Sequence, residues 1–201
     1  MALPALAVAI DVDLDRVRER LSRRAHQRYL GEATRRAAVA AVLRRGPLDT
    51  ELLLILRAER DGDPWSGHMA LPGGHHDPAD ADLLATARRE TLEEVGLDLE
   101  QHELLGALDE HAASAQGRFT GLVVAPFVFA LSADSELRPN HEVAELLWTP
   151  LGRMARGETE VMKELERDGR HMSLPGYRVG EHVVWGLTHR VLQSFFAALD
   201  S

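Results

Sequence analysis

Apolar residues recur along the chain with two periods, which together predict strands interleaved with helices. Ala37 to Leu43 and Glu51 to Leu56 are β-competent apolar runs joined by a turn-like Arg-Arg-Gly-Pro segment, so we predict a pair of strands. Further strands are expected at Glu103 to Leu108, Leu122 to Leu131 and Val143 to Trp148. The pattern indicates a mixed α/β sandwich in which helices cover a sheet.

The N-terminal part of the chain has its own pattern. Apolar residues at helical spacing predict an amphipathic helix over Asp13 to Leu30, within an extension that we place at residues 1–34, ahead of a main domain at 35–201. The apolar opening from Met1 to Ile10 has no basic residues ahead of it and runs into aspartates, unlike a signal peptide. We therefore expect a cytoplasmic protein.

A second helix is expected to begin near Asp77, with Asp77 as its cap and Pro78 at the first helical position, and to end at Gly96. Its spacing predicts a buried face made of Leu84, Ala87, Thr91 and Val95.

The C-terminal third carries weaker signals. Leu151 to Glu166 is weakly helical, Arg178 to Trp185 is expected to be extended, and Leu187 to Leu199 has the spacing of a closing amphipathic helix.

Composition narrows the function classes. The 201 residues suit one domain, and no apolar run approaches the roughly 20 residues of a membrane-spanning helix. The absence of cysteine excludes disulfides, thiolate metal sites and a cysteine nucleophile. A net charge of −9 disfavours nucleic-acid binding. The one lysine, Lys163, lacks the glycine-rich context of a P-loop, so the commonest NTPase motif is missing.

Three carboxylates carry the strongest chemical signal. Glu90, Glu93 and Glu94 are spaced i, i+3 and i+4, so they share one side of the predicted helix. Like charges at this spacing destabilise a helix by about 0.2 to 0.5 kcal/mol per pair, a cost that a hard cation such as Mg²⁺ offsets. Arg89, four residues before Glu93, can hold that carboxylate. Alone, the pattern also fits an ordinary solvated acidic face.

A glycine turn upstream favours the metal interpretation. Pro72-Gly73-Gly74 exposes bare backbone that can offer a carbonyl ligand or approach a phosphate closely. With this turn, the stretch from Arg89 to Leu97 resembles the signature of the Nudix hydrolases, G-x5-E-x7-R-E-U-x-E-E-x-G-U, with Thr91 in the first apolar slot. The resemblance implies an α/β/α sandwich with a mixed central sheet and a carboxylate-bearing catalytic helix.

The resemblance also implies roles for individual residues. Glu90, Glu93 and Glu94, with the Gly73 carbonyl, would bind Mg²⁺, for which Mn²⁺ could substitute. Arg89, Glu93 and Glu94 would be catalytic, and the backbone of Gly74 would meet the substrate. Glu142 is a candidate further ligand or base, although it also fits a loop residue that marks the start of a strand.

Between Gly74 and Arg89 this chain has one residue more than the signature allows. Counting forward from Gly74 places Asp80 at the first acidic position, whereas counting back from Arg89 places Ala81 there. The extra residue, together with the segments around Arg57, Gly67 and Trp185-Gly186-Leu187-Thr188, resembles the coenzyme A diphosphatase branch of the family.

The branch resemblance implies Mg²⁺-dependent cleavage of coenzyme A, or an acyl derivative, to 4′-phosphopantetheine and adenosine 3′,5′-bisphosphate. Arg57 and Arg60 could meet the 3′-phosphate, since a guanidinium forks onto phosphate oxygens, although both also fit a solvated surface. Three histidines, His75, His76 and His111, lie near the proposed site, where they either take part in it or are simply solvated.

Two alternatives remain open at this stage. The same chemistry could act on ADP-ribose, nucleotide sugars or dinucleotides, or the chain could be a non-catalytic Nudix-fold module that binds nucleotides or another protein. We expect a small-molecule nucleotide diphosphate as partner, no nucleic acid and no membrane, and the sequence allows a homodimer.

Overall fold

The computed structural model describes residues 12–60, 65–115, 118–132, 135–167 and 170–200, and the apolar opening from Met1 to Ile10 lies outside them. The strands are β1 (Arg35–Arg45), β2 (Thr50–Arg57), β3 (Met69–Ala70), β4 (Gly73–His75), β5 (Glu103–Ala107), β6 (His111–Ala115), β7 (Arg118–Ala130), β8 (Val143–Pro150), β9 (Glu160–Arg167), β10 (Arg170–Val179) and β11 (His182–Trp185). The helices are α1 (Leu14–Arg23), α2 (Leu83–Val95), a 3₁₀ turn η1 (Leu99–Gln101), α3 (Leu151–Ala155) and α4 (Gly186–Asp200).

The main sheet is built around β1, which pairs with strands on both of its edges. It runs parallel to β7 from the pair Arg35 and Leu122 to the pair Leu43 and Ala130, and antiparallel to β2 and β4. Within the described ranges, eight strands form this mixed sheet. The predicted strand pair and the strands at β5, β7 and β8 are confirmed, and β6, which the sequence analysis did not identify, lies against β7.

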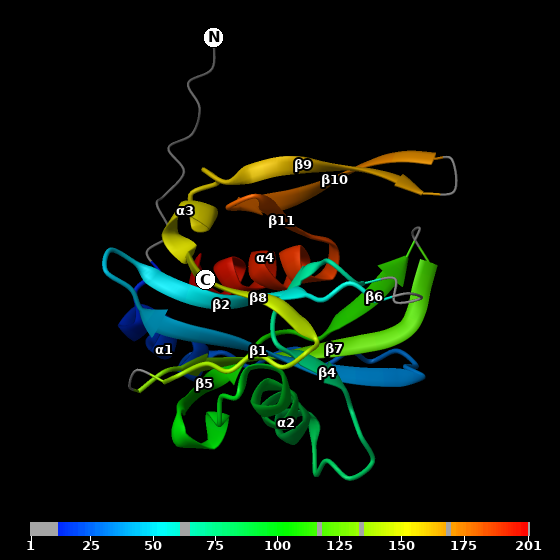
Figure 1. The fold of residues 1–201 in the computed structure, drawn as a ribbon. Coiled ribbons are helices and arrows are strands. Elements are labelled where there is room, and N and C mark those ends of the chain that lie inside the picture. Colours follow the sequence, from blue (N-terminus) through cyan, green and yellow to red (C-terminus); the bar gives the residue numbers. More distant parts are fainter. Residues whose placement is uncertain (1–11, 61–64, 116–117, 133–134, 168–169, 201) are drawn as a thin grey trace.

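Helices cover both faces of the sheet, so the predicted α/β/α sandwich is confirmed (Figure 1). On one face α2 packs against β1, with Val95 and Leu97 in a core that includes Ala40 and Val42. On the other face α1 and α4 pack against each other, and Val17 and Phe195 belong to the larger core. Alternate residues of β1 therefore serve two separate cores.

The N-terminal helix is shorter than predicted. It begins after Asp13, whose side chain accepts a hydrogen bond from the Asp15 N–H, and it ends at Arg23 instead of Leu30. Beyond it, Arg24 forms an ion pair with Asp109 at 2.6 Å. The Gln27 N–H donates a hydrogen bond to the same carboxylate instead of to a helix carbonyl. Ala25, predicted on the helix, is exposed.

The prediction of a helical region from Leu151 to Glu166 is wrong beyond Ala155. Gly157 has a positive φ of 73°, and β9 follows, with Val161, Lys163 and Leu165 half-buried and the residues between them exposed. This period of two marks a strand, and pairing with β10 overrides the helix-forming composition. The single extended segment predicted at Arg178 to Trp185 is a hairpin, in which β10 and β11 pair across the turn at Gly180.

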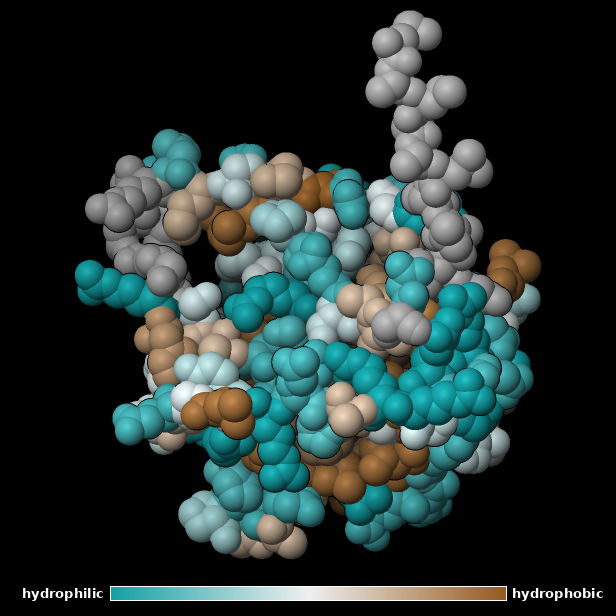
Figure 2. Space-filling view, turned by 180° about the vertical axis from the view of Figure 1, so that it is seen from behind, coloured by the Kyte–Doolittle hydropathy of each residue, from teal (hydrophilic) through white to brown (hydrophobic). Residues whose placement is uncertain are grey.

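The closing helix is confirmed as α4, which buries His189, Val191, Leu192, Phe195, Phe196, Ala198 and Leu199. Seen from behind, the surface is largely hydrophilic with scattered apolar patches (Figure 2). Among the described residues no helix is long and apolar enough to cross a membrane.

Candidate active site

The acidic helix α2 is defined by its two ends and its inner face. Asp82 caps the first turn, because its carboxylate accepts a hydrogen bond from the Ala85 N–H at 2.8 Å, and Gly96 ends the helix in the left-handed conformation. Ala87, Thr91 and Val95 are buried as predicted, and Leu84 is half-buried.

The predicted helix start at Asp77 and Pro78 is wrong by several residues. The Asp77 carboxylate accepts a hydrogen bond from the Ala79 N–H at 2.8 Å, and the Asp77 carbonyl accepts another from Asp80. An aspartate that bonds two residues ahead forms a turn in competition with a helix. The helix therefore starts at Leu83, and the preceding turn carries Asp80 toward α2.

The three glutamates of α2 have different surroundings. Glu94 is buried and accepts a hydrogen bond from the Gly73 N–H at 2.8 Å. Glu90 is half-buried beside Gly74, while the Glu93 side chain is 55% exposed. The predicted common side of the helix thus has an inner part, formed by Glu90 and Glu94, and an outer part, formed by Glu93.

Close contacts require a glycine at position 73 and leave little room for a side chain at position 74. Gly73 has a φ of 144°, and a Cβ there would collide with the carbonyl oxygen of Ala38. A Cβ on Gly74 would collide with the carboxylate of Glu90. The backbone at Gly73 therefore admits no side chain, and the bare backbone of Gly74 lies against the Glu90 carboxylate.

Arg89 contacts both the inner and the outer part of the helix side. Its guanidinium lies 2.9 Å from Glu90 Oε1 and 3.2 Å from Glu93 Oε2, and it donates a hydrogen bond of 3.1 Å to the His75 carbonyl. It also binds both carboxylate oxygens of Asp80. The structure thus gives Asp80, and not the exposed Ala81, the contact with Arg89.

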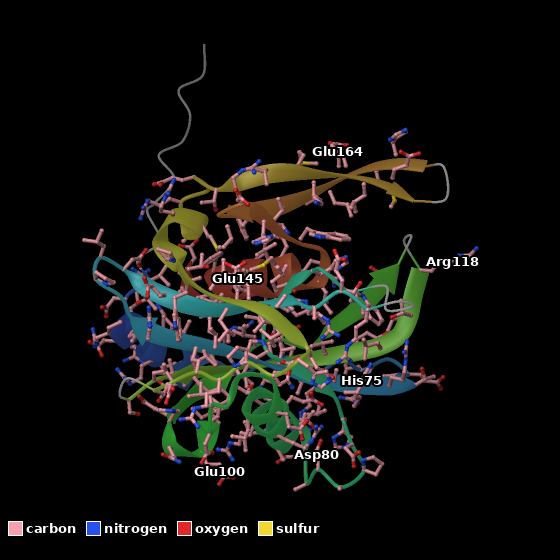
Figure 3. The ribbon with its side chains drawn as sticks, in the orientation of Figure 1. His75, Asp80, Glu100, Arg118, Glu145 and Glu164 are labelled. Atoms are coloured by element: carbon pink, nitrogen blue, oxygen red, sulfur yellow. The ribbon has the colours of Figure 1, made fainter. Side chains whose placement is uncertain are left out.

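Asp80 accepts hydrogen bonds from Arg89 and from Thr86, a partner that the sequence does not predict. Its side chain is 6% exposed and accepts a hydrogen bond of 2.8 Å from the Thr86 hydroxyl. The Arg89 guanidinium holds the pKa of the Asp80 carboxyl well below its usual range. Only the fold, which brings the turn over the first helical turn, reveals this contact. Figure 3 shows Asp80 on the loop between His75 and α2.

Burial dominates the electrostatics of the inner carboxylates. Burial raises the pKa of Glu94 to about 7, although the hydrogen bond from the Gly73 N–H and the charge of Arg57 both lower this pKa. Loss of solvent also raises the pKa of Glu90. The charge of Glu142 contributes to both shifts, so the fold brings this distant glutamate to the same site.

A loop after β7 places Glu142. The Asn140 N–H donates a hydrogen bond of 2.9 Å to the Glu94 carbonyl, and the Asn140 side chain accepts one from the Glu142 N–H at 2.7 Å. The Glu142 carboxylate forms an ion pair with Arg60 at 3.0 Å. We refer to Gly73, Gly74, Glu90, Glu94 and Glu142 together as the acidic site.

Two arginines, Arg57 and Arg60, lie beside carboxylates of the acidic site. Arg57, at the end of β2, lies 3.8 Å from Glu94, and Arg60 pairs with Glu142. The histidines are further out: His75 is exposed, and His76 Nδ1 lies 2.9 Å from the Thr86 hydroxyl. His111 is half-buried on β6.

The side chains fit a hard divalent cation in donor type. Every candidate donor is a carboxylate or backbone oxygen, the ligands that Mg²⁺ prefers, and a cation would relieve the mutual repulsion that helps to raise the pKa of Glu90 and of Glu94. Across the described ranges, no three histidine, aspartate or glutamate groups already surround one point. Glu90 faces Arg89 and Glu142 faces Arg60 instead.

Comparisons with known proteins give a match to one family model and to several relatives. Residues 34–168 match the model of the NUDIX domain. An uncharacterized protein of Schizosaccharomyces pombe is 43% identical over 119 residues, which are 57% of this chain and 36% of that protein. Human mitochondrial coenzyme A diphosphatase NUDT8 is 36% identical over 139 residues, 68% of this chain and 58% of that protein. The chain thus covers between about a third and somewhat over half of these two relatives.

A solved structure also shares the fold. The NUDIX hydrolase from Alicyclobacillus acidocaldarius has a TM-score of 0.53 at 20% identity, over 86% of this chain and 98% of that chain.

Proposed function

Because this chain belongs to the Nudix domain family, we propose that it is a pyrophosphohydrolase that cleaves the diphosphate bond of a nucleotide-containing small molecule, with coenzyme A or an acyl derivative as preferred substrate. In this proposal residues 35–201 form the catalytic domain and residues 1–34 an extension. The observation that carries the chemistry is the buried Glu94, held between the Gly73 N–H and Arg57 and close in charge to Glu90 and Glu142.

Glu90, Glu93, Glu94 and the Gly73 carbonyl would hold Mg²⁺, or Mn²⁺ in its place. When bound, the cation offsets the negative charge of the diphosphate and makes a coordinated water more acidic. Arg89, anchored by Asp80, fixes Glu90 and limits how far Glu93 can turn away. In this proposal α2 supplies three of the oxygen donors and the turn before it supplies the fourth, and Glu93 would turn inward to join the others.

The remaining residues act on water and on the substrate. Glu142 or a glutamate of α2 accepts the proton as a water oxygen attacks one phosphorus, and the bond to the bridging oxygen breaks so that this oxygen leaves with the other phosphoryl group. The bare backbone of Gly74 allows the diphosphate close to the carboxylates. Arg57, beside Glu94, places a positive charge where the leaving group becomes more negative.

The preference for coenzyme A has two supports. The human relative that is 36% identical carries the name of a coenzyme A diphosphatase, and the segments around Arg57, Gly67 and Trp185 resemble that branch. In the structure these segments meet, because the Arg57 N–H bonds to the His68 carbonyl and the His68 ring lies 4.6 Å from the Trp185 ring. They thus form one wall beside the acidic site.

A substrate panel with product identification by mass tests the proposal. The panel holds coenzyme A, acetyl-coenzyme A, ADP-ribose, a nucleotide sugar and a dinucleotide, each with Mg²⁺ and with excess EDTA. We expect coenzyme A to give 4′-phosphopantetheine and adenosine 3′,5′-bisphosphate at the highest rate. Much faster cleavage of ADP-ribose or a nucleotide sugar would overturn the substrate assignment, and no cleavage of any member would overturn the activity.

A further inference from the structure

A cationic pocket lies next to the acidic site, at the end of the β1 and β4 ladder. We propose that this pocket binds a second anionic group of the substrate, a phosphomonoester separate from the diphosphate that is cleaved. The proposal rests on the proposed function and names the part of the substrate that the pocket reads. The pocket has a volume of about 500 Å³ and is lined by Ala33, Thr34, Arg35, Arg36, His75 and His76.

Strand pairing brings the four basic residues together. Ala37 is the register partner of His75, and the His76 N–H donates a hydrogen bond of 2.9 Å to the Arg36 carbonyl. The backbone of Arg35 and Arg36 is therefore held next to the backbone of the two histidines, and all four residues line the pocket.

The two arginines of the pocket differ in their partners, because Arg36 forms an ion pair and Arg35 bonds to a backbone carbonyl. Arg36 lies 3.2 Å from both carboxylate oxygens of Glu110, whose side chain is 5% exposed, so this guanidinium serves the fold. Arg35 is exposed and donates to the Thr120 carbonyl at 3.1 Å, and within the described residues no carboxylate forms an ion pair with it. In a chain of net charge −9, Arg35 thus offers a positive charge to an incoming anion.

The pocket neighbours the acidic site along the chain. His75 and His76 follow Gly73 and Gly74 directly, and the His75 carbonyl accepts a hydrogen bond from Arg89. Figure 3 shows His75 at the end of β4, above the loop that carries Asp80. A substrate whose diphosphate lies against Gly74 can therefore reach the pocket with a neighbouring group.

The same observations favour Arg35 over Arg57 for this role. Arg57 lies 3.8 Å from Glu94, and Arg60 is paired with Glu142, so both cations already face the carboxylates where the diphosphate is expected. Arg35 is the pocket cation that combines exposure with the absence of such a pairing. The 3′-phosphate of coenzyme A, which the sequence analysis assigned to Arg57 and Arg60, fits the pocket by charge.

Binding of two products tests the pocket without turnover. Calorimetry in Mg²⁺ compares adenosine 3′,5′-bisphosphate with AMP, which lacks the 3′-phosphate. The wild-type protein should bind the bisphosphate about tenfold or more tightly, and Arg35→Ala should bring the two affinities within about twofold of each other. Arg35→Lys, which keeps the charge without the fork, should be intermediate. Arg45→Ala, at the other end of β1 and paired with Asp15, is the matched control and should keep the full difference.

Kinetics then separate the two proposals. With coenzyme A, Arg35→Ala should raise KM about tenfold with kcat unchanged, and with dephospho-coenzyme A it should change neither. If the wild-type protein binds both products equally, or if Arg35→Ala keeps the wild-type preference, the pocket proposal is wrong, while diphosphate cleavage at the acidic site would stand. Absence of hydrolysis alongside a preference that depends on Arg35 would overturn the proposed function and leave the pocket.

Discussion

Asp80 and Arg89 form a two-point ion pair, with Arg89 Nε 2.9 Å from Asp80 Oδ1 and Nη2 3.0 Å from Oδ2. The remaining nitrogen of the guanidinium, Nη1, reaches Glu90 and Glu93. The side chain that orients two of the acidic residues is thus fixed from a loop nine residues upstream.

Asp80→Asn should weaken this arrangement. We expect turnover to fall by about tenfold to a hundredfold, because Glu90 and Glu93 lose their fixed partner. Unfolding free energy should fall by about 1 to 3 kcal/mol, since a hydrogen-bonded charge pair is broken. The measurements are initial rates and urea titrations. Asp98→Asn removes the half-buried cap of η1, away from Arg89, and should leave turnover within about twofold. Equal behaviour of the two variants would show that Asp80 does not position Arg89.

Activity should depend on a divalent cation. The inner carboxylates repel one another in a site with little solvent, so substrate with further negative charge is not expected to bind productively without one. Dialysis against EDTA should abolish turnover, and Mg²⁺ or Mn²⁺ should restore it. Full activity after exhaustive chelation, checked by elemental analysis, would contradict the mechanism.

Stability of the metal-free protein should report the burial of Glu94. Its pKa is raised from an ordinary value of 4.5 to about 7, so the native state holds this proton more tightly than the unfolded chain does. The contribution of Glu94 to the free energy of unfolding is therefore largest below about pH 4.5 and is lost as the pH rises through about 7. Glu94→Gln, which cannot ionise, should gain stability relative to wild type between pH 5 and pH 8, by about 1 kcal/mol or more at pH 8.

The neighbouring Glu93 provides the control for this prediction. Its side chain is 55% exposed on the same helix, so Glu93→Gln replaces a carboxylate that is not buried and should not reproduce the gain expected for Glu94→Gln. Urea titrations in EDTA at each pH give the comparison. A flat difference for Glu94→Gln would mean that Glu94 ionises as freely as a surface carboxylate.

Arg57→Ala tests the division of labour between the two cationic regions. Because Arg57 lies beside Glu94, its loss should lower kcat/KM for coenzyme A and for dephospho-coenzyme A by the same factor, about tenfold or more. The ratio of the two kcat/KM values is the readout. If the variant instead loses only its preference for coenzyme A, Arg57 reads the 3′-phosphate as the sequence analysis anticipated.

The sequence predicted those parts of the site that local physics decides. Helical spacing placed Ala87, Thr91 and Val95 on the buried face of α2, and Gly96 ended the helix where expected. Counting could not choose between Asp80 and Ala81, because the answer depends on the path of a loop that Asp77 bends into a turn. The placement of Glu142 near enough to influence the pKa of Glu90 and of Glu94 was anticipated only by resemblance, since these residues are far apart in the chain.

Other differences come from tertiary pairing that local propensity does not contain. β9 is rich in good helix formers, yet residues from Val161 to Glu166 pair with β10 and alternate in exposure. The N-terminal helix stops at Arg23, and Arg24 pairs with Asp109 across the fold.

The most direct test of the central claim is coenzyme A hydrolysis by wild type and by Glu94→Gln, with products identified by mass in Mg²⁺. Wild type should release 4′-phosphopantetheine and adenosine 3′,5′-bisphosphate, and the variant, which keeps the shape of the side chain and loses its charge, should be slower by about a hundredfold or more while remaining folded. A Glu94→Gln rate within a few-fold of wild type would contradict the account, because the buried carboxylate would then be peripheral to the reaction.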